Sequence, residues 1–298
     1  MRWEGGRRSK NVEDRRGMSA GGPAAGGAVL RLLPLLVRSK GGRWLLLVGV
    51  VLFVGARVVG IDLMPLLTGG SSPTSQSTRT FTAAEQQLAE FVSVVLADTE
   101  DTWGELFATL GRDYRHPSLV LFTDRVHSAC GAAQSAMGPF YCPADQKIYI
   151  DLDFYSDLKT RYQAPGDFAQ AYVIAHEVGH HVQTLLGISQ QVHQSRSRVS
   201  GVEGNRLSVM QELQADCFAG VWGYHADTQR QLLDSGDLEE ALTAAAAIGD
   251  DRLQQQARGT VVPDSFTHGS SEQRVRWFRR GFESGHVSSC DTFNAASL

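Results

Sequence analysis

The sequence has 298 residues but only four cysteines, and none of them lies in a C-x-x-C pair. That absence argues against a cysteine zinc knuckle or a thioredoxin-like redox motif. No internal repeat is visible along the chain. The length accommodates one large domain or two small ones.

A basic surface is lacking from most of the chain. Residues 1–57 carry eleven Lys and Arg against three Asp and Glu, a net charge of about +8. Residues 58–298 carry seventeen against twenty-nine, a net charge of about −12. Because nucleic-acid binding needs a basic footprint, the acidic main part argues against a nucleic-acid partner.

The basic first part predicts a tail and a membrane anchor. Residues 1–27 are rich in Gly, Arg, Ser and Ala and have no apolar period, so a basic, disordered cytoplasmic tail is predicted over 1–43. Within it, the apolar stretch 28–37 is expected to lie at the membrane interface or to form a short helix before the membrane. The apolar run 44–61 is broken only by Arg57 and, at roughly 18 residues, is near the lower limit for crossing a bilayer. A polar linker is expected at 62–80.

Positive charges set the expected orientation of this anchor. They precede the run directly, at Arg38, Lys40 and Arg43. The positive-inside rule then predicts a cytoplasmic N-terminus and an extracytoplasmic main domain, with a single helix contacting the lipid bilayer. A cleaved signal peptide is the alternative, although the charged region of about forty residues before the run is long for one. A buried core helix is a second alternative.

Residues 81–298 are expected to form one α+β, mainly helical domain with a small β-sheet. A capping box at Thr82 and Glu85 begins a helix with an apolar stripe. Alternating apolar residues predict strands at 118–126 and 147–153. Helical periodicity predicts five further segments, 167–186, 189–200, 205–227, 237–258 and 270–284.

The segment 175–180 contains the pattern H-E-x-x-H. On a helix, His176 and His180 lie on one face and can bind one Zn²⁺ per chain, with Glu177 beside them as general base. The pattern should appear by chance in about 1–2% of chains of this composition. However, these polar residues lie almost opposite the apolar stripe of the same helix, whereas two core histidines would lie within it. The segment therefore predicts a metal-binding face that lines a cleft.

A catalytic zinc ion usually has three protein ligands. The metzincin continuation is lacking, because Gln183 and Leu186 stand three and six residues after His180. Downstream, Glu212 and Asp216 are one helical turn apart on one face. Glu212 can supply the third ligand, and Asp216 can accept the ring N–H of a ligating histidine.

H-E-x-x-H followed by E-x-x-A-D resembles the gluzincin pattern of thermolysin-like and membrane-bound CaaX/heat-shock metalloproteases. As a whole, the chain most closely resembles the bacterial putative neutral zinc metallopeptidase family. The resemblance is carried by 11–16 (NVEDRR), 138–145 (GPFYCPAD), 176–181 (HEVGHH), 212–220 (ELQADCFAG) and 268–278 (HGSSEQRVRWF). It covers nearly the whole chain and implies a zincin-like metallopeptidase fold. It says little about the substrate.

The resemblance also points to a residue that could stabilise the oxyanion. His268 and Arg274 are spaced as in the H-P-x-x-x-x-R segment of membrane gluzincins, although Gly269 stands where Pro would. His268 is therefore a candidate active-site donor, or alternatively a surface histidine capping the last helix. Weaker candidates are Tyr224, His225, Tyr155 and Tyr162. His181 points about 100° away from His180 and is expected to be structural.

Two further expectations concern the domain around the site. In gluzincin-like folds, a strand such as 147–153 edges the cleft and pairs with an extended peptide. In an extracytoplasmic domain the four cysteines are expected to form disulfides, preferably Cys130–Cys142 and Cys217–Cys290. Three pairings are open from the sequence alone, and four buried free thiols are the alternative.

Two functions from different classes fit these residues. The first is a membrane-anchored, zinc-dependent endopeptidase that hydrolyses peptide or protein substrates, with Glu177 activating the zinc-bound water. The second is a catalytically silent, membrane-tethered zinc-binding or scaffold module. A structural zinc site normally has four protein ligands, and no fourth is evident, so the first is preferred.

Overall fold

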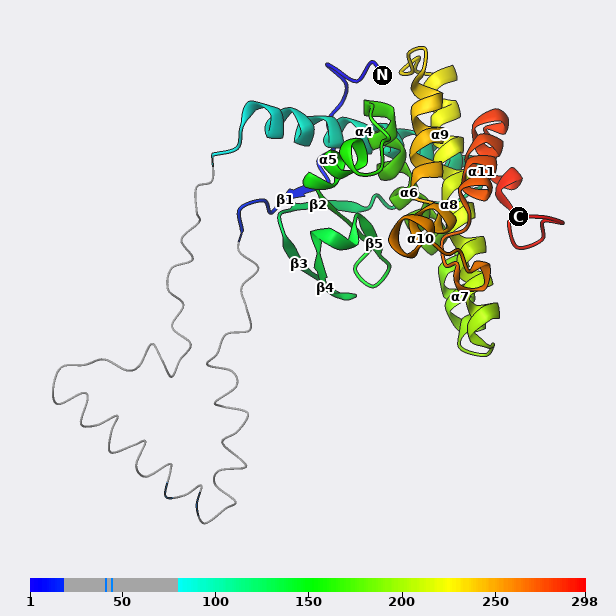
Figure 1. Ribbon diagram of the computed structural model, residues 1–298. Coiled ribbons are helices and arrows are strands. Elements are labelled where there is room, and N and C mark those ends of the chain that lie inside the picture. The colour runs from blue at the N-terminus through cyan, green and yellow to red at the C-terminus, as the bar shows by residue number, and fades with distance from the viewer. Residues whose placement is uncertain (19–40, 42–43, 45–79) are drawn as a thin grey trace. The chain divides into compact units, whose positions relative to one another are not determined.

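A computed structural model of the chain describes residues 1–18, 41, 44 and 80–298 (Figure 1). Met1–Arg16 and Thr80–Leu298 form one compact unit. This unit is mainly helical and has one four-stranded sheet and one two-stranded sheet, as predicted for the main domain. The apolar stretch 28–37, the predicted anchor apart from Trp44, and the predicted linker apart from Thr80, lie outside the described residues. Across the described part of the chain, no helix has the length and apolarity needed to cross a bilayer.

The four-stranded sheet has the order β1-β2-β6-β5. Its strands are β1 (Val12–Asp14), β2 (Ser118–Phe122), β6 (Lys147–Asp151) and β5 (Phe140–Cys142). β1, β2 and β6 run parallel, and β5 is antiparallel to β6. The predicted strand 118–126 is in fact two strands, because Asp124 adopts a left-handed φ of 63° after β2. The chain turns there into the hairpin of β3 (Arg125–Ser128) and β4 (Gly131–Gln134).

β6 is an inner strand of this sheet. It pairs with β2 on one side and with β5 on the other, so both rows of its backbone hydrogen-bonding groups face neighbouring strands. The expectation that the strand at 147–153 pairs with a substrate peptide is therefore wrong. β5 is the edge strand on that side of the sheet, and β1 is the edge strand on the other.

The predicted helical segments are found, and one further helix, Asp153–Thr160 (α5), was not predicted. They are α4 (Ala83–Thr109), α5 (Asp153–Thr160), α6 (Asp167–Leu185), α7 (Ile188–Arg196), α8 (Gly201–Thr228), α9 (Asp237–Ala247), α10 (Asp250–Arg258) and α11 (Ser271–Ser284). Short 3₁₀ turns are η1 (Ser135–Met137), η2 (Pro263–Ser265) and η3 (Val287–Cys290). The capping box of Thr82 and Glu85 is formed. The predicted helix 237–258 is interrupted at Ile248 and Gly249, which gives α9 and α10.

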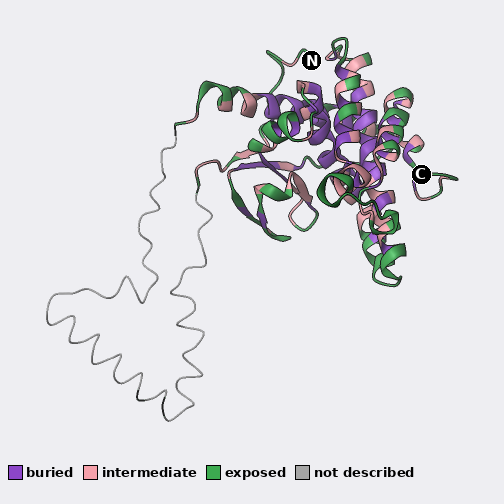
Figure 2. Ribbon diagram, viewed as in Figure 1, coloured by how far each residue is buried: buried purple, intermediate pink, exposed green. Residues whose placement is uncertain are grey.

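α6 and α8 pack against each other in the middle of the helical part, with α9 and α11 beside them (Figure 1). The facing sides of these helices are buried, as Figure 2 shows. Gly179 permits the contact between α6 and α8, because a Cβ there would lie 2.9 Å from the backbone oxygen of Ala215. The close approach occurs at the level of H-E-x-x-H and E-x-x-A-D, so it brings these two motifs together.

The N-terminal residues belong to the folded unit, and the prediction of a disordered tail is wrong for residues 1–16. β1 adds a parallel strand to β2. Ser9 and Asn11 donate side-chain hydrogen bonds of 2.5 and 2.7 Å to the buried carboxylate of Glu100. Arg7 contacts the same carboxylate at 3.1 Å and Asp101 at 2.7 Å. Two of the arginines that suggested a solvated tail, Arg7 and Arg8, are thus paired with acidic residues of α4.

This pairing bears on the predicted membrane orientation. Residues that share a β-sheet lie on the same side of a bilayer, and residues 1–16 share a sheet with residues of the main domain. A single crossing at 44–61 would put them on opposite sides. The predicted single-pass orientation, with a cytoplasmic N-terminus, and the observed β1–β2 pairing therefore cannot both hold in one molecule.

Candidate metal centre

α6 and α8 place the three predicted ligands around one point. The ligand atoms of His176, His180 and Glu212 all lie within 4.8 Å of one another. One carboxylate oxygen of Glu212 is 3.2 Å from Nε2 of His176 and 3.4 Å from Nε2 of His180. Two imidazole nitrogens and one carboxylate oxygen are a donor set typical of catalytic zinc, with a fourth position left for water. The residues present therefore fit a zinc ion.

The other ring nitrogen of each histidine is engaged by an acceptor. Nδ1 of His176 lies 2.8 Å from Oδ1 of Asp216, the partner that the sequence predicts. Nδ1 of His180 lies 2.9 Å from Oε1 of Gln183. A hydrogen bond at Nδ1 leaves Nε2 available for a metal and fixes the orientation of the ring. The role of Gln183 was missed from the sequence, where its only signal is a polar side chain three residues after His180.

Asp216 is fully buried beneath His176 and is paired with Arg274 of α11. Nε and Nη2 of Arg274 each lie 2.9 Å from its carboxylate oxygens, and Tyr172 donates a hydrogen bond of 2.5 Å to it. Burial raises the pKa of Asp216, but the charges of Arg274 and His176 outweigh it and lower the pKa to about 2. Because this pKa is depressed, the stability that these contacts contribute is present above the unfolded-state pKa of about 3.9 and is lost as the pH falls towards 2.

The ligand histidines also have shifted pKa values. Burial lowers the pKa of His176, but Asp216 and Glu212 outweigh it and raise the pKa to about 10. For Glu212, burial acts to raise the pKa, but the two histidines lower it well below its usual range. A metal ion at this point must displace the protons of the histidines, so metal affinity is expected to fall as the pH is lowered.

A cavity of about 360 Å³ opens beside the three ligand residues. Glu177 and His268 line it together with them. Its walls come from the segment before and within β5, from α5 and the residues just after it, and from the start of α10. They include Met137, Phe140, Tyr141, Phe154, Tyr162 and Leu253. The carboxylate of Glu177 and the imidazole of His268 therefore lie next to the metal position without belonging to the ligand cluster.

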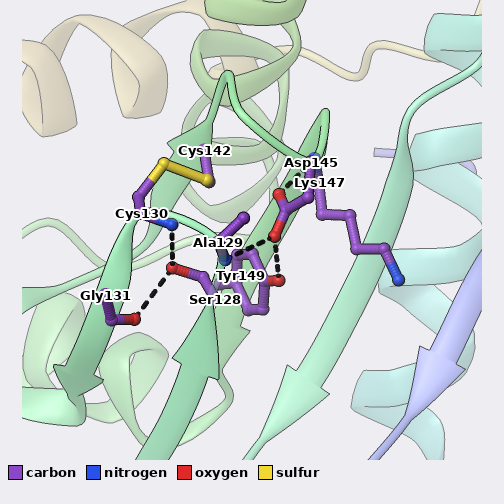
Figure 3. Close-up of a disulfide and its surroundings, with 8 residues drawn as sticks. All are labelled: Ser128, Ala129, Cys130, Gly131, Cys142, Asp145, Lys147 and Tyr149. Atoms are coloured by element: carbon purple, nitrogen blue, oxygen red, sulfur yellow. Dashed lines mark hydrogen bonds between the residues drawn. A yellow bond between two sulfur atoms is a disulfide. The ribbon is translucent and has the colours of Figure 1, made fainter.

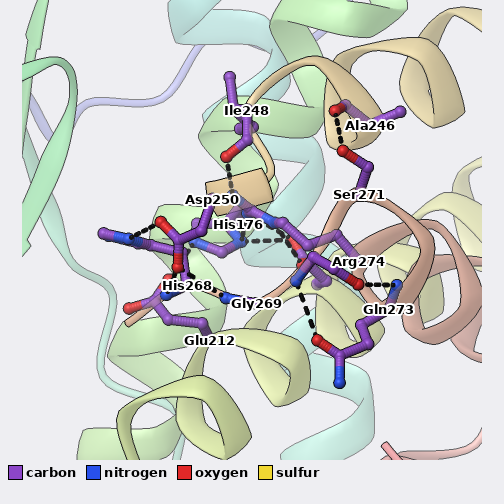
Figure 4. Close-up of polar contacts among 12 residues, drawn as sticks. His176, Glu212, Ala246, Ile248, Asp250, His268, Gly269, Ser271, Gln273 and Arg274 are labelled. Atoms are coloured by element: carbon purple, nitrogen blue, oxygen red, sulfur yellow. Dashed lines mark hydrogen bonds and ion pairs between the residues drawn. The ribbon is translucent and has the colours of Figure 1, made fainter. Parts of the chain in front are cut away.

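Asp250 holds the loop that carries His268. Its carboxylate accepts the backbone N–H groups of Thr267, His268 and Gly269 at 2.7, 2.6 and 3.1 Å. Its other oxygen lies 3.4 Å from Nδ1 of His268 (Figure 4). The side-chain hydrogen bond with Asp250 raises the pKa of His268. Ser270, and not His268, caps α11, so the helix-capping alternative for His268 is wrong.

The weaker candidates occupy different places. His225 donates from Nε2 to the backbone oxygen of Gly285 at 3.0 Å, outside the cavity. Tyr162 lines the cavity, whereas Tyr155 and Tyr224 do not. His181 is fully buried, with Nε2 2.6 Å from the backbone oxygen of Arg115. Burial lowers the pKa of His181 to about 4, and its contacts with Arg115 and with the hydroxyl of Tyr141 in β5 are structural.

Both preferred disulfides are formed. Cys130–Cys142 links the turn of the β3–β4 hairpin to the end of β5 (Figure 3). Next to it, the Asp145 carboxylate accepts the backbone N–H of Ala129 at 2.9 Å and the hydroxyl of Tyr149 at 2.8 Å. Cys217–Cys290 links α8 to η3. The first disulfide thus fixes the edge strand that lines the cavity.

Comparison with known proteins gives one family and several relatives. The family described as "Putative neutral zinc metallopeptidase" matches residues 1–293. "Uncharacterized protein YpfJ" of Escherichia coli K12 is 57% identical over 293 residues, which cover 98% of this chain and 99% of that protein. "Uncharacterized protein Rv2575" of Mycobacterium tuberculosis H37Rv is 43% identical over 218 residues, 70% of this chain and 73% of that protein. No solved structure matches the chain.

Proposed function

Because the chain belongs to the putative neutral zinc metallopeptidase family, we propose that it is a zinc-dependent endopeptidase. One observation carries the proposal: the cluster of His176, His180 and Glu212 opens on a cavity that Glu177 also lines. A structural zinc site does not require a carboxylate such as that of Glu177 beside the metal position.

The residues take separate roles in peptide hydrolysis. Bound zinc supplies a Lewis acid and lowers the pKa of a water molecule. Glu177 accepts the proton of the attacking water and passes it to the leaving amine. His268 donates a hydrogen bond to the oxyanion of the tetrahedral intermediate. The substrate backbone pairs with β5, the edge strand whose Phe140 and Tyr141 line the cavity.

A peptide-library digest separates this function from that of a silent zinc-binding module. The full chain is purified, its zinc content is measured, and cleavage products are identified by mass spectrometry with and without a chelator. We expect internal peptide bonds to be cut, the chelator to abolish cutting, and added zinc to restore it. One equivalent of bound zinc without any cleavage would favour the binding module.

His268→Ala is expected to lower kcat by about 10²-fold, the usual effect of removing one oxyanion donor. The zinc content should stay unchanged, because His268 is not part of the ligand cluster. The measurement is kcat on the best library peptide, with bound zinc determined in parallel. His193→Ala, a change on the surface of α7, is the matched control and should retain wild-type kcat. Wild-type kcat in His268→Ala would remove this residue from the mechanism.

We also propose that the folded unit lies on the extracytoplasmic side and contacts the bilayer through the segment 44–61. Two disulfides support that side, because disulfides persist in oxidising compartments. In this proposal residues 1–16 lie with the main domain, and not in the cytoplasm as the charge pattern suggests.

Cysteine labelling tests the sidedness. Lys10 and Arg280 are both solvent-exposed. The variants Lys10→Cys and Arg280→Cys are treated with a membrane-impermeant maleimide in intact spheroplasts. We expect both variants to be labelled without permeabilisation. Labelling of Arg280→Cys alone would support the single-pass orientation with a cytoplasmic N-terminus and would exclude the β1–β2 pairing. Labelling of neither would place the unit in the cytoplasm.

A further inference from the structure

Two buried glutamines lie between the metal centre and the C-terminal disulfide. Gln183 of α6 is fully buried, and Gln214 of α8 is 5% exposed. A buried amide is costly unless its donors and acceptor are hydrogen-bonded. Both N–H groups and the oxygen of the Gln183 amide have partners, the nitrogen and the oxygen of the Gln214 amide have one each, and these partners connect His180 to η3. Nothing in the proposed reaction uses either residue.

The hydrogen bonds form a chain with one direction. Nε2 of Gln214 donates to the backbone oxygen of Cys290 at 2.9 Å. Nε2 of Gln183 donates to the backbone oxygen of Gln211 at 2.7 Å and to Oε1 of Gln214 at 3.1 Å. Oε1 of Gln183 then faces Nδ1 of His180 at 2.9 Å.

The two backbone carbonyls decide this direction, because a carbonyl oxygen can only accept. Gln214 must therefore present its amide nitrogen to Cys290 and its oxygen to Gln183. With both hydrogens of its own amide nitrogen used, Gln183 has only its oxygen to offer to His180. A flip of either amide would put two acceptors against each other. His180 is consequently required to donate from Nδ1, which leaves the lone pair of Nε2 towards Glu212.

We propose that Gln183 and Gln214 are positioning residues, which form a relay from the carbonyl of Cys290 that fixes His180 in its metal-binding tautomer. The carbonyl of Cys290, where the relay begins, is itself held in place, because the Cys217–Cys290 disulfide links η3 to α8. His176 is held differently, by the charged carboxylate of Asp216. The proposal rests on the proposed zinc site but not on peptidase activity.

Zinc dissociation constants measured by chelator competition test the relay on the full chain. Gln183→Met removes the acceptor for His180 and is expected to weaken zinc binding by about 10- to 100-fold, as for other partners of ligating histidines. Gln214→Met, which leaves Gln183 in place, should weaken it less. In combination with Gln183→Met it should add nothing, because the relay acts through Gln183. Gln211→Met is the matched control, since it keeps the backbone carbonyl, and it should bind zinc like the wild type.

Gln183→Glu separates tautomer control from simple packing. This variant keeps an acceptor for His180 but loses both donated hydrogen bonds, so it should bind zinc nearly as tightly as the wild type while unfolding more easily. Zinc binding by Gln183→Met equal to that of Gln211→Met would overturn the relay. Equal weakening in Gln183→Met and Gln183→Glu would also overturn it. Because zinc affinity is read without a peptidase assay, failure of the relay and failure of the proposed catalysis give different results.

Discussion

Glu177→Gln is expected to keep its zinc and to lose hydrolysis by a factor on the order of 10²–10⁴, the usual contribution of a positioned general base. Glutamine has the shape of glutamate but cannot accept the proton of the attacking water. Glu177 lines the cavity beside the metal position and is not part of the ligand cluster, so the site should still form. The measurements are the zinc content of the purified variant and kcat on the best library peptide.

The control for this prediction is Glu203→Gln, which makes the same change at an exposed position in the first turn of α8. It should retain wild-type kcat. An unchanged rate of hydrolysis in Glu177→Gln would exclude Glu177 as the general base. Loss of zinc together with activity would show that Glu177 helps to hold the metal, which the ligand geometry does not predict.

The parts of the site that the sequence predicted are local to one helix or to a pair of helices. H-E-x-x-H and E-x-x-A-D each put their residues on one helical face, because the period of 3.6 residues fixes which side chains are neighbours. His176, His180 and Glu212 could therefore be named before their contacts were known. Asp216 followed from the same periodicity together with the need of a ligating histidine for an acceptor.

Other features depend on contacts between distant segments, and here the sequence misled or was silent. β1 has three residues and pairs with a strand more than a hundred positions away, so the surrounding Gly and Arg residues suggested disorder. β5 is equally short, and without it β6 looked like an edge strand. Asp250 and His268 are 18 positions apart, with most of α10 and all of η2 between them, and no period connects the two. Gln183 and Gln214 acquire their roles only where α6 and α8 meet.

Arg274 was predicted only through its spacing from His268, and its contacts suggest a larger role in stability. It is 3% exposed and lies against the fully buried Asp216, with a further hydrogen bond of 3.1 Å from Nη2 to the hydroxyl of Tyr172. Removing one member of a buried ion pair leaves the other charge without compensation, which costs about 3–5 kcal/mol of the free energy of unfolding. Arg274→Met is therefore expected to destabilise the chain by about that amount.

Denaturant unfolding of the zinc-free chain measures this loss without a contribution from the metal. The matched control is Arg276→Met on the same helix, where Arg276 pairs with Glu272 at the surface at 2.6 Å. Exposed pairs of this kind contribute about 1 kcal/mol or less. Equal effects of the two substitutions would mean that Asp216 does not depend on Arg274 for its charge. A large effect of Arg274→Met alone would show that the ion pair under His176 stabilises the fold before zinc binds, since Arg274 together with His176 keeps the Asp216 carboxylate ionised.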